Sequence, residues 1–480
     1  MKQFIKNIAF SLFILASVIG CETYEVINTE DTGIVNLENS FEQKFYIGSD
    51  LSYVNEMLDC GASYKNFTGN EANPYKIFSD AGNNLVRVRL WNDPSAWTKY
   101  SNIDDVEKTI SSSKEQGMDV LLDFHYSDTW ADPGNQLIPL AWLDLLDDTE
   151  ALGERLYNYT YNTLDNLAAK ELLPKIVQIG NEINSNILNK EAGAVDIFWE
   201  RNAFLINKGI QAVRDISKKH DARVQIMLHI AQPENALWWF EKATENGIVN
   251  YDWIGVSYYP KWSDYQVSDV SDAIATLGSS YNKKVMIVET AYPFTLEDVD
   301  AAGNILGKSV YPVSQQGQLE YLIDLKREIK EGKGFGLVYW EPAWVSTSCS
   351  TLWAEGSHWD NTTLFDNNGN PTLGMNIFND TYEQDTTCSS IWALGDGVPD
   401  ALWNWDNAIE ISCDGTKNVI EVNLVENKFR FFQTNGDWDS GIGYQYFLNR
   451  GFTIDSKLQG ASDNDDNFVF GGTEGLYTLE

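Results

Sequence analysis

The segment KIVQIGNE at residues 175–182 is an almost continuous apolar run that ends in Gly180, Asn181 and Glu182. Such a run is typical of a strand that is buried on both faces of a parallel sheet. Seven further short runs rich in β-branched residues occur along the chain, and each is followed by a longer segment. The eight runs cover residues 45–51, 84–91, 119–126, 175–182, 223–230, 253–259, 285–290 and 335–340.

The segments between these runs include patterns typical of helices. Isoleucine, leucine and valine recur at helical intervals in residues 104–116, 152–171 and 203–219. Lys218 and Lys219 suit the negative end of the last helix. Eight alternating units over about 300 residues predict an α/β fold with a (β/α)8 barrel. Periodicity alone leaves a doubly wound open sheet as the alternative.

The pattern changes after the expected barrel domain, which spans residues 43–380. Residues 381–389 are polar and indicate a linker. In residues 390–480 the apolar period becomes two, as in 418–424 and 428–432, and turn residues are frequent. This region is therefore predicted to form a small all-β sandwich.

Residues 1–20 have the features of an export signal, with a short apolar run that is too brief to span a bilayer as a mature helix. Cys21 follows Val-Ile-Gly, as in a bacterial lipoprotein signal, and residues 21–42 read as a polar tether. We expect an exported protein, lipid-anchored through Cys21 to the outer membrane at the cell surface. The alternative is an ordinary signal peptide with a chance cysteine. The sequence does not pair the remaining cysteines, Cys60, Cys349, Cys388 and Cys413.

The composition restricts the class of ligand. The 480 residues include 34 Lys and Arg against 70 Asp and Glu, a net charge of −36. Such a charge argues against nucleic acids and anionic membrane surfaces, which attract basic patches. The chain also has 17 Trp, and sugar rings stack on aromatic side chains. A neutral polysaccharide fits both features, although acidity alone also keeps an exported protein soluble.

Two carboxylates follow strands of the predicted barrel. Glu182 ends the run at 175–182, and Glu289 lies near the end of the run at 285–290. Side chains at the C-terminal ends of barrel strands meet at one rim. Glycoside hydrolysis uses a pair of this kind. The alternative for either residue alone is an exposed carboxylate in a loop.

Eight ordered motifs extend this pattern over residues 44–378. The sequence resembles glycoside hydrolase family 53, the endo-β-1,4-galactanases, within a large clan of retaining barrel glycosidases. The motifs that carry the resemblance are YIGSDLSYVNEM (46–57), RVRLWNDP (87–94), DFHYSDTWADP (123–133), QIGNEIN (178–184), GVSYYPKW (255–262), ETAYPFTL (289–296), YWEPAW (339–344) and WDNTTLFD (359–366).

The resemblance implies endo-hydrolysis of β-1,4-D-galactosidic bonds in (arabino)galactan with retention of configuration. It makes Glu182 the acid/base and Glu289 the nucleophile, with carboxyl groups about 5–5.5 Å apart. Asn181 is expected to bind the sugar 2-hydroxyl, and Arg89 and Tyr258 to orient the nucleophile. Competing interpretations are another endo-glycanase of the clan, acting on mannan, xylan or cellulose, and a non-catalytic glycan-capture lipoprotein.

Further residues at strand ends are expected to contact substrate. Trp340 is expected to form the floor of the site for the cleaved sugar. Core packing is the alternative for each of the other tryptophans, and Glu341 is a rival carboxylate outside the expected pair. The other expected substrate-binding residues are Trp91, Asp123, His125 and Trp359.

The resemblance implies no required cofactor. Bacterial relatives carry calcium in the loop after the seventh strand, but Ala302 stands where a histidine is expected, so a structural calcium is not predicted. If one binds, Asp298, Asp300 and Asn304 offer oxygen ligands. We expect a monomer whose partner is the polysaccharide.

Residues 392–475 resemble the small C-terminal β domains of starch-binding surface lipoproteins. The residues that carry this resemblance include WNWD at 403–406 and GDWDSGIGY at 436–444. It implies glycan binding through Trp403, Trp405 and Trp438. The alternative is a spacer that holds the enzyme away from the membrane.

Overall fold

The computed structural model describes residues 44–351, 354–380, 388–415, 417–462 and 465–480. The expected signal peptide at 1–20, the lipidation site Cys21, the tether and most of the expected linker therefore lie outside the described residues.

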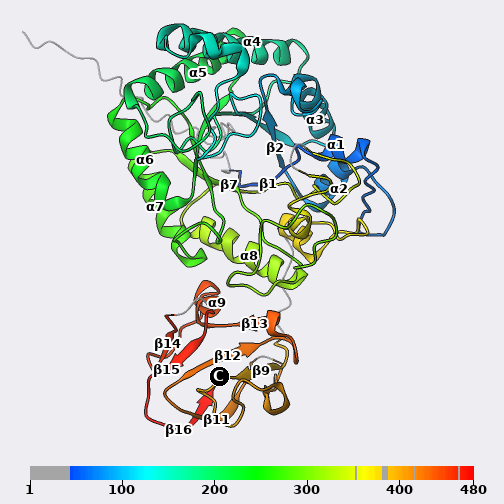
Figure 1. Ribbon diagram of the computed structural model, residues 1–480, viewed down its shortest axis with the longest axis vertical. Coiled ribbons are helices and arrows are strands. Elements are labelled where there is room, and N and C mark those ends of the chain that lie inside the picture. The colour runs from blue at the N-terminus through cyan, green and yellow to red at the C-terminus, as the bar shows by residue number, and fades with distance from the viewer. Residues whose placement is uncertain (1–43, 352–353, 381–387, 416, 463–464) are drawn as a thin grey trace, which may run out of the picture. The chain divides into compact units, whose positions relative to one another are not determined.

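Eight parallel strands form a closed barrel in chain order, and helices surround it (Figure 1). This confirms the predicted (β/α)8 fold class and excludes the open sheet. The strands are β1 (Tyr46–Asp50), β2 (Leu85–Leu90), β3 (Asp119–Phe124), β4 (Ile176–Ile179), β5 (Gln225–Ala231), β6 (Trp253–Ser257), β7 (Lys284–Glu289) and β8 (Gly336–Tyr339).

Several barrel helices begin at a side chain that accepts a hydrogen bond from the first helical turn. Asn102, Asp148 and Ser314 cap α3, α4 and α8 in this way. The three helices expected at 104–116, 152–171 and 203–219 correspond to α3, α4 and α5. The helices are α1 (Val54–Asp59), α2 (Pro74–Ala81), α3 (Ile103–Glu115), α4 (Thr149–Ala169), α5 (Trp199–Lys219), α6 (Pro233–Glu245), α7 (Val270–Tyr281) and α8 (Gln315–Glu331).

A tight turn follows β4 and brings two polar side chains to the barrel rim. Gly180 has φ +79°, and a Cβ at this position would lie 2.5 Å from Cγ2 of Ile183. Glycine tolerates this left-handed conformation without steric cost. The chain therefore leaves the strand at Ile179, and Asn181 and Glu182 follow at the C-terminal end of the barrel.

The C-terminal region consists of antiparallel β sheets, as the alternation predicted. The runs expected at 418–424 and 428–432 correspond to β11 and β12, whereas helix α9 was not predicted. The elements are β9 (Ile391–Leu394), β10 (Ile409–Ile411), β11 (Ile420–Leu424), β12 (Lys428–Phe432), β13 (Gly441–Ile442), α9 (Tyr444–Asn449), β14 (Leu458–Gly460), β15 (Phe468–Phe470) and β16 (Gly475–Leu479).

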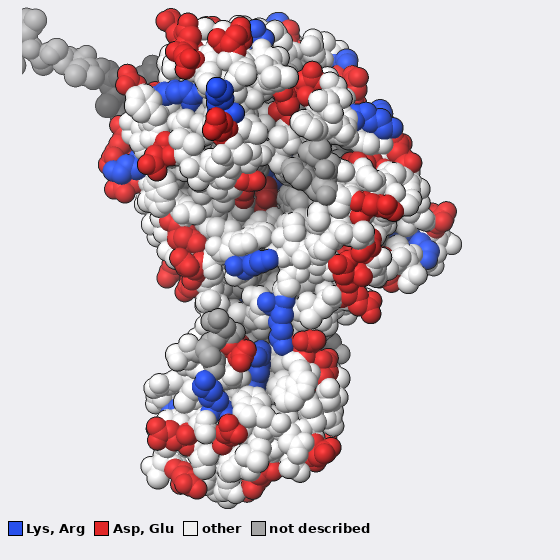
Figure 2. All heavy atoms as spheres, viewed as in Figure 1, with Lys and Arg blue, Asp and Glu red and all other residues white. Residues whose placement is uncertain are grey.

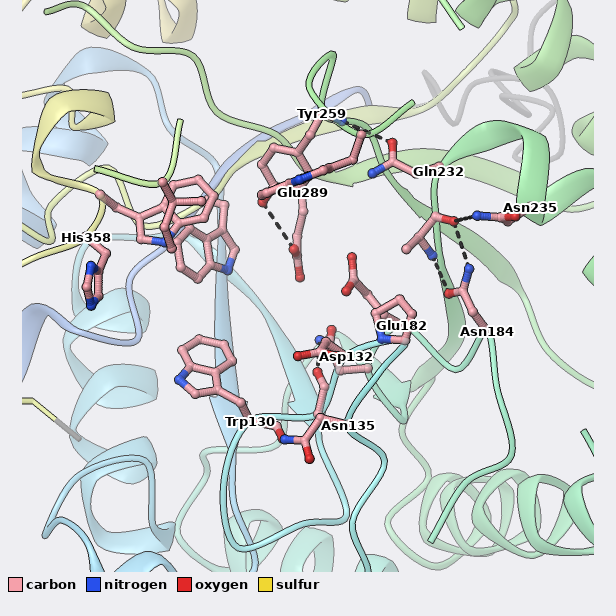
Figure 3. A pocket seen from close by; sticks show the side chains of 18 of the residues that line it. Trp130, Asp132, Asn135, Glu182, Asn184, Gln232, Asn235, Tyr259, Glu289 and His358 are labelled. Carbon is pink, nitrogen blue, oxygen red and sulfur yellow. Dashed lines mark hydrogen bonds between the residues drawn. The ribbon is translucent and has the colours of Figure 1, made fainter. Parts of the chain in front are cut away.

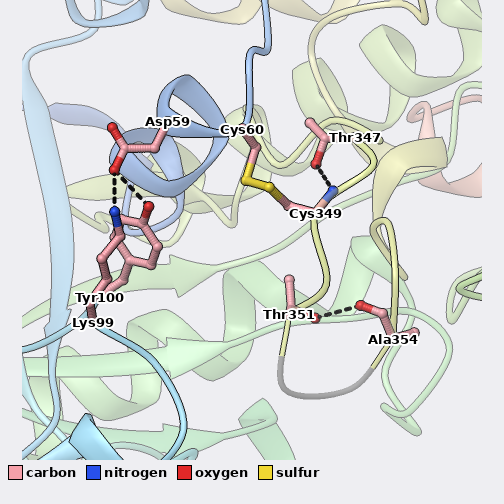
Figure 4. The surroundings of a disulfide bond; sticks show 8 residues. All are labelled: Asp59, Cys60, Lys99, Tyr100, Thr347, Cys349, Thr351 and Ala354. Atoms are coloured by element: carbon pink, nitrogen blue, oxygen red, sulfur yellow. Dashed lines mark hydrogen bonds and ion pairs between the residues drawn. A yellow bond between two sulfur atoms is a disulfide. The ribbon is translucent and has the colours of Figure 1, made fainter.

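Two disulfides pair the four cysteines that the sequence left unpaired. Cys60 and Cys349 join the end of α1 to the segment after β8 (Figure 4), and Cys388 pairs with Cys413. The first bond links residues 289 positions apart in the chain. It therefore ties a barrel loop at the beginning of the domain to one at its end. Within the described residues, no helix is long and apolar enough to cross a membrane.

Candidate active site

A cleft of about 650 Å³ opens at the C-terminal ends of the barrel strands. Figure 2 shows this hollow, with acidic atoms inside it and mostly uncharged surface around it. The lining residues come from the C-terminal ends of β3 to β8 and the segments that follow them, and are Trp130, Ala131, Asp132, Pro133, Asn135, Asn181, Glu182, Asn184, Ala231, Gln232, Asn235, Tyr259, Trp262, Glu289, Ile305, Trp340, Trp344, His358 and Trp359.

The carboxyl groups of Glu182 and Glu289 face each other across this cleft (Figure 3). Their hydrogen-bond partners differ. Glu289 is bound by a guanidinium nitrogen of Arg87 at 2.7 Å and by the hydroxyl of Tyr259 at 3.2 Å. Glu182 accepts one hydrogen bond of 2.6 Å from the hydroxyl of Ser257. Glu289 therefore has the stronger stabilisation of a negative charge.

The environment raises the pKa of both carboxyl groups. Burial, followed by the negative charge of Glu289, raises the pKa of Glu182 well above its ordinary value. Burial raises the pKa of Glu289 to about 7, and the charge of Arg87 opposes this rise. Of the two, Glu182 is the better proton donor near neutral pH, since it lacks a cationic partner. A pair with separated protonation states of this kind can divide acid and nucleophile roles.

The cation that pairs with Glu289 is Arg87, not Arg89 as we expected. Arg87 also contacts Asp50 at 2.8 Å and Asp123 at 2.7 Å, and donates to Asn181 at 2.7 Å. It is 1% exposed. One buried guanidinium thus balances three carboxylates.

Arg89 instead pairs with Glu341 at 2.5 Å. Its guanidinium lies 4.1 Å from the ring centre of Tyr53 and 4.5 Å from that of Trp130. The second oxygen of Glu341 accepts the backbone N–H of Tyr53. Glu341 is 1% exposed and outside the cleft lining. Glu341, the alternative catalytic carboxylate, is therefore held in an ion pair with Arg89, and Arg89 packs against the ring of Trp130.

The tyrosine that contacts Glu289 is Tyr259, not Tyr258 as we expected. Ser257, the last residue of β6, lies two residues before Tyr259 and points toward Glu182. Successive side chains along a strand point to opposite sides. Tyr258 therefore points away from the barrel interior, where its hydroxyl donates to the backbone carbonyl of Tyr265. Tyr259 returns to the cleft.

The remaining expected substrate-binding residues divide into two groups. Asn181, Trp340 and Trp359 line the cleft. Asn181 uses one N–H for the carbonyl of Ala131 and has a second for a ligand. Trp91, Asp123 and His125 were expected to contact substrate, but they are buried outside the cleft lining.

These three residues form a hydrogen-bonded row below the cleft. The indole N–H of Trp91 donates to Nδ1 of His125 at 3.2 Å, and Nε2 of His125 lies 3.1 Å from Asp123. Asp123 in turn contacts Arg87. The row supports the residues around Glu289 rather than binding sugar itself.

The two ends of the cleft differ in chemistry. On one side of the carboxyl pair, the rings of Trp340 and Trp359 lie 4.4 Å apart, and Trp130 is 5.8 Å from Trp340. On the other side lie the amides of Asn184, Gln232 and Asn235 (Figure 3). Aromatic rings suit sugar faces, and amides suit sugar hydroxyls.

The sequence interpretation missed Arg87, Tyr259, Ser257 and His229. Tyr259 could have been identified from the alternation of side chains along a strand. This alternation puts Tyr259 on the same side as Ser257, which faces the barrel interior, and Tyr258 on the opposite side. For Arg87, the register pairs it with Asp50 of β1, which only the structure reveals.

Buried oxygens that lack a hydrogen-bond partner occur in the loops after β7 and β8, where Asp360 lies near Asp298 and Asp300. Both carboxyl oxygens of Asp360 and the amide oxygens of Asn304 and Asn361 are buried without a hydrogen bond of acceptable geometry. Burial and the charges of Asp300 and Asp298 raise the pKa of Asp360 to about 7. Among the described residues, no group of three or more His, Cys, Asp or Glu side chains is placed as metal ligands. Any cation here must rely on amide and backbone oxygens as well, which calcium accepts.

Comparisons with known proteins agree with this geometry. The sequence profile of Glycosyl hydrolase family 53 matches residues 46–378. The chain is 54% identical to an arabinogalactan endo-beta-1,4-galactanase of Cellvibrio japonicus, over 67% of this chain and 86% of that protein. It is 33% identical to an endo-beta-1,4-galactanase of Bacillus subtilis, over 73% and 89%. The solved catalytic domain of the family from Ignisphaera aggregans has a TM-score of 0.65 at 32% identity, covering 72% of this chain and 98% of that one.

Proposed function

Because the chain belongs to glycosyl hydrolase family 53, we propose that it hydrolyses internal β-1,4-galactosidic bonds of (arabino)galactan with retention of configuration. The observation that carries the proposal is the pair of buried carboxyl groups, Glu182 and Glu289, in a cleft lined by tryptophan. The names of the relatives supply the substrate class.

The unequal environments of the two carboxyl groups support distinct roles. Glu289, held by Arg87 and Tyr259, attacks C1 of the sugar as a carboxylate. Glu182 protonates the leaving oxygen and then deprotonates the water that cleaves the glycosyl-enzyme. The second N–H of Asn181 would bind the 2-hydroxyl, and Trp340 and Trp359 would stack on sugar rings.

A substrate panel tests the proposed activity. We expect the full-length protein to release reducing sugar from linear β-1,4-galactan but not from mannan, xylan or cellulose. Proton NMR of the first products should show the β anomer. Activity on another of these glycans alone would contradict the galactan assignment, and an α anomer would contradict retention. Binding without hydrolysis would indicate a glycan-capture protein.

The C-terminal region is proposed to bind glycan as well. The rings of Trp405 and Trp438 lie 5.0 Å apart, and Phe432 packs against both. Trp438 is 48% exposed and Trp403 is 36% exposed. Exposed indoles held by an aromatic support are suited to stacking on a sugar chain.

Replacing Trp438 by alanine is expected to weaken galactan binding without changing hydrolysis of a short soluble oligosaccharide. Affinity electrophoresis in galactan gels measures the binding, with an expected fall of about tenfold. The matched control is Trp97→Ala, because Trp97 is 59% exposed on the barrel. Equal migration of both variants would indicate a spacer.

A structural calcium ion is proposed to bind the buried oxygens in the loops after β7 and β8. Asp360, Asn304 and Asn361 supply the oxygens that lack hydrogen bonds. Asp300 already accepts backbone N–H groups of Ala302 and Ser357. The ion would stabilise the two loops and takes no part in bond cleavage.

Removal of divalent cations is therefore expected to lower the unfolding temperature by several degrees. A ligand at about 100 times its Kd stabilises a fold by about 2.7 kcal/mol. Calorimetry with EDTA, with and without added calcium, measures the shift. The control is Asp360→Asn, whose unfolding temperature should not respond to EDTA. A wild-type protein indifferent to EDTA would contradict the calcium site.

Export and lipid anchoring through Cys21 remain a proposal that rests on the sequence of residues 1–42. Membrane fractionation of cells that express the protein with Cys21→Ser is the test. The variant should leave the membrane fraction. A variant that stays there would show that Cys21 is not the anchor.

A further inference from the structure

Two polar side chains behind Glu182 form a hydrogen-bonded pair outside the cleft lining. The hydroxyl of Ser257, at the end of β6, lies 2.6 Å from Oε1 of Glu182. Nε2 of His229, on β5, lies 2.8 Å from the same hydroxyl oxygen. Both residues are 0% exposed. Neither is among the substrate-binding residues assigned above.

His229 has partners for either neutral tautomer. Its Nδ1 lies 2.9 Å from the amide oxygen of Asn181 and 3.1 Å from the amide nitrogen of Gln178. The Gln178 amide is oriented by Asp123, which only accepts, and by Arg87, which only donates. Nδ1 can therefore donate to Asn181 or accept from Gln178. The backbone N–H of Glu182 also lies 3.4 Å from Nδ1 as a donor. With Nδ1 as the acceptor, Nε2 donates to the Ser257 oxygen and leaves the hydroxyl proton for Oε1 of Glu182.

The imidazole of His229 stays neutral at working pH. Burial, together with the charge of Arg87, lowers its pKa well below the usual value of 6.5. A neutral ring adds no charge beside the acid/base, so its contribution is geometric.

We propose that Ser257 and His229 are positioning residues, which hold Oε1 of Glu182 so that Oε2 is the oxygen that exchanges the proton. The proposal rests on the function proposed above and assigns the reacting atom within it. In the first step, the proton on Oε2 moves to the glycosidic oxygen. The C1–O bond breaks, and a bond forms between C1 and Glu289.

In the second step, water attacks C1, its proton moves to Oε2, and the bond from C1 to Glu289 breaks. Ser257 donates to Oε1 when Glu182 is ionised, and Oε1 still accepts when the proton sits on Oε2. The carboxyl plane therefore does not need to rotate between the two steps. Such preorganisation saves the cost of reorienting the group during the reaction.

The hydroxyl of Ser257 also acts on the protonation of Glu182, because a hydrogen bond to the ionised form lowers its pKa. The other groups around Glu182 keep their effects when Ser257 is changed. Glu289 on β7 and Asp132 after β3 raise the pKa, Arg87 on β2 lowers it, and Tyr259 and His229 are neutral. Loss of the hydroxyl should therefore raise the pKa of Glu182.

Ser257→Ala in the full-length protein tests this assignment. Its kcat/KM on galactan is expected to fall about tenfold or more, because the proton donor is less well placed. With a nitrophenyl β-galacto-oligosaccharide, whose leaving group needs no proton, the fall should be below about threefold. The alkaline limb of kcat/KM on galactan should move up by about one pH unit, because Glu182 remains protonated to higher pH.

Ser49→Ala is the matched control. Ser49 is a fully buried serine on strand β1 whose hydroxyl donates to Asn83 at 3.2 Å, away from the carboxyl pair. It should show neither the substrate-dependent loss nor the shift of the limb. If Ser257→Ala does not fold, Ser257→Cys, which preserves volume but donates weakly, should move the limb in the same direction.

An equal loss on both substrates with an unmoved alkaline limb would show that Ser257 is merely structural. Unchanged kinetics in a folded Ser257→Ala protein would also overturn the inference. These outcomes are distinct from failure of the proposed function, which would appear as a wild-type protein without galactan hydrolysis.

Discussion

Galactan hydrolysis is expected to fall by about four orders of magnitude or more when Glu289 is replaced by alanine, since removal of a nucleophile has effects of this size. In the proposed mechanism the carboxylate of Glu289 attacks C1, and Glu182, held by Ser257, serves as the acid/base and does not replace it. Arg87 and Tyr259 would remain as donors without a nucleophile. Reducing-sugar release from linear β-1,4-galactan measures the loss.

Azide distinguishes loss of the nucleophile from loss of the fold. In Glu289→Ala, the small anion can enter the vacated space and attack C1, so an activated substrate should yield the α-glycosyl azide. The control is Glu341→Gln, which changes a buried carboxyl paired with Arg89 outside the cleft and should keep hydrolysis within about tenfold of wild type. Substantial galactan hydrolysis by Glu289→Ala would contradict the assigned nucleophile.

The fold was accessible from sequence because barrel strands are buried on both faces and lie between segments with helical spacing. The expected runs agree with the eight strands to within a few residues. The largest difference is at β4, which ends at Ile179 rather than Glu182. The conformation of Gly180, with φ +79°, ends the strand early. A glycine within a strand pattern is only a weak indication of such a turn, because glycine adopts positive and negative φ about equally readily and the sequence does not show which one it has.

The carboxyl pair was also accessible, since its position depends only on which residues follow β4 and end β7. The residues that contact the carboxyl pair could not be identified from the sequence, because which side chains reach the pair depends on how deep in the barrel each one lies. Arg87 and Arg89 are two positions apart and point to the same side of β2. Only the packing of Asp50 beside Arg87, and of Glu341 beside Arg89, separates their functions. Both contacts join residues far apart in sequence.

The second large effect is expected from replacement of Arg87 by methionine. The guanidinium lies within 2.8 Å of Asp50, Asp123 and Glu289, all of which are buried. Removing the cation from a buried ion pair costs about 3–5 kcal/mol. We therefore expect a lower free energy of unfolding, measured by denaturant titration, and a large loss of activity at neutral pH.

The pH dependence gives this variant a specific signature. The charge of Arg87 lowers the pKa of Glu289, which burial raises to about 7. Without Arg87 that pKa rises further, so more of the nucleophile is protonated at any given pH. The acidic limb of kcat/KM, which reports ionisation of Glu289, should therefore move to higher pH, and activity should recover in part as the pH increases.

Arg89→Met separates this electrostatic effect from general destabilisation. It also leaves a buried carboxylate, Glu341, without its cation, so a comparable loss of stability is expected. Because Arg89 makes no contact with Glu289, the acidic limb of kcat/KM should stay at its wild-type position. If both variants moved the limb equally, the pKa of Glu289 would depend on the total charge of the barrel interior. If only Arg87→Met moves it, the direct contact between Arg87 and Glu289 keeps the nucleophile ionised.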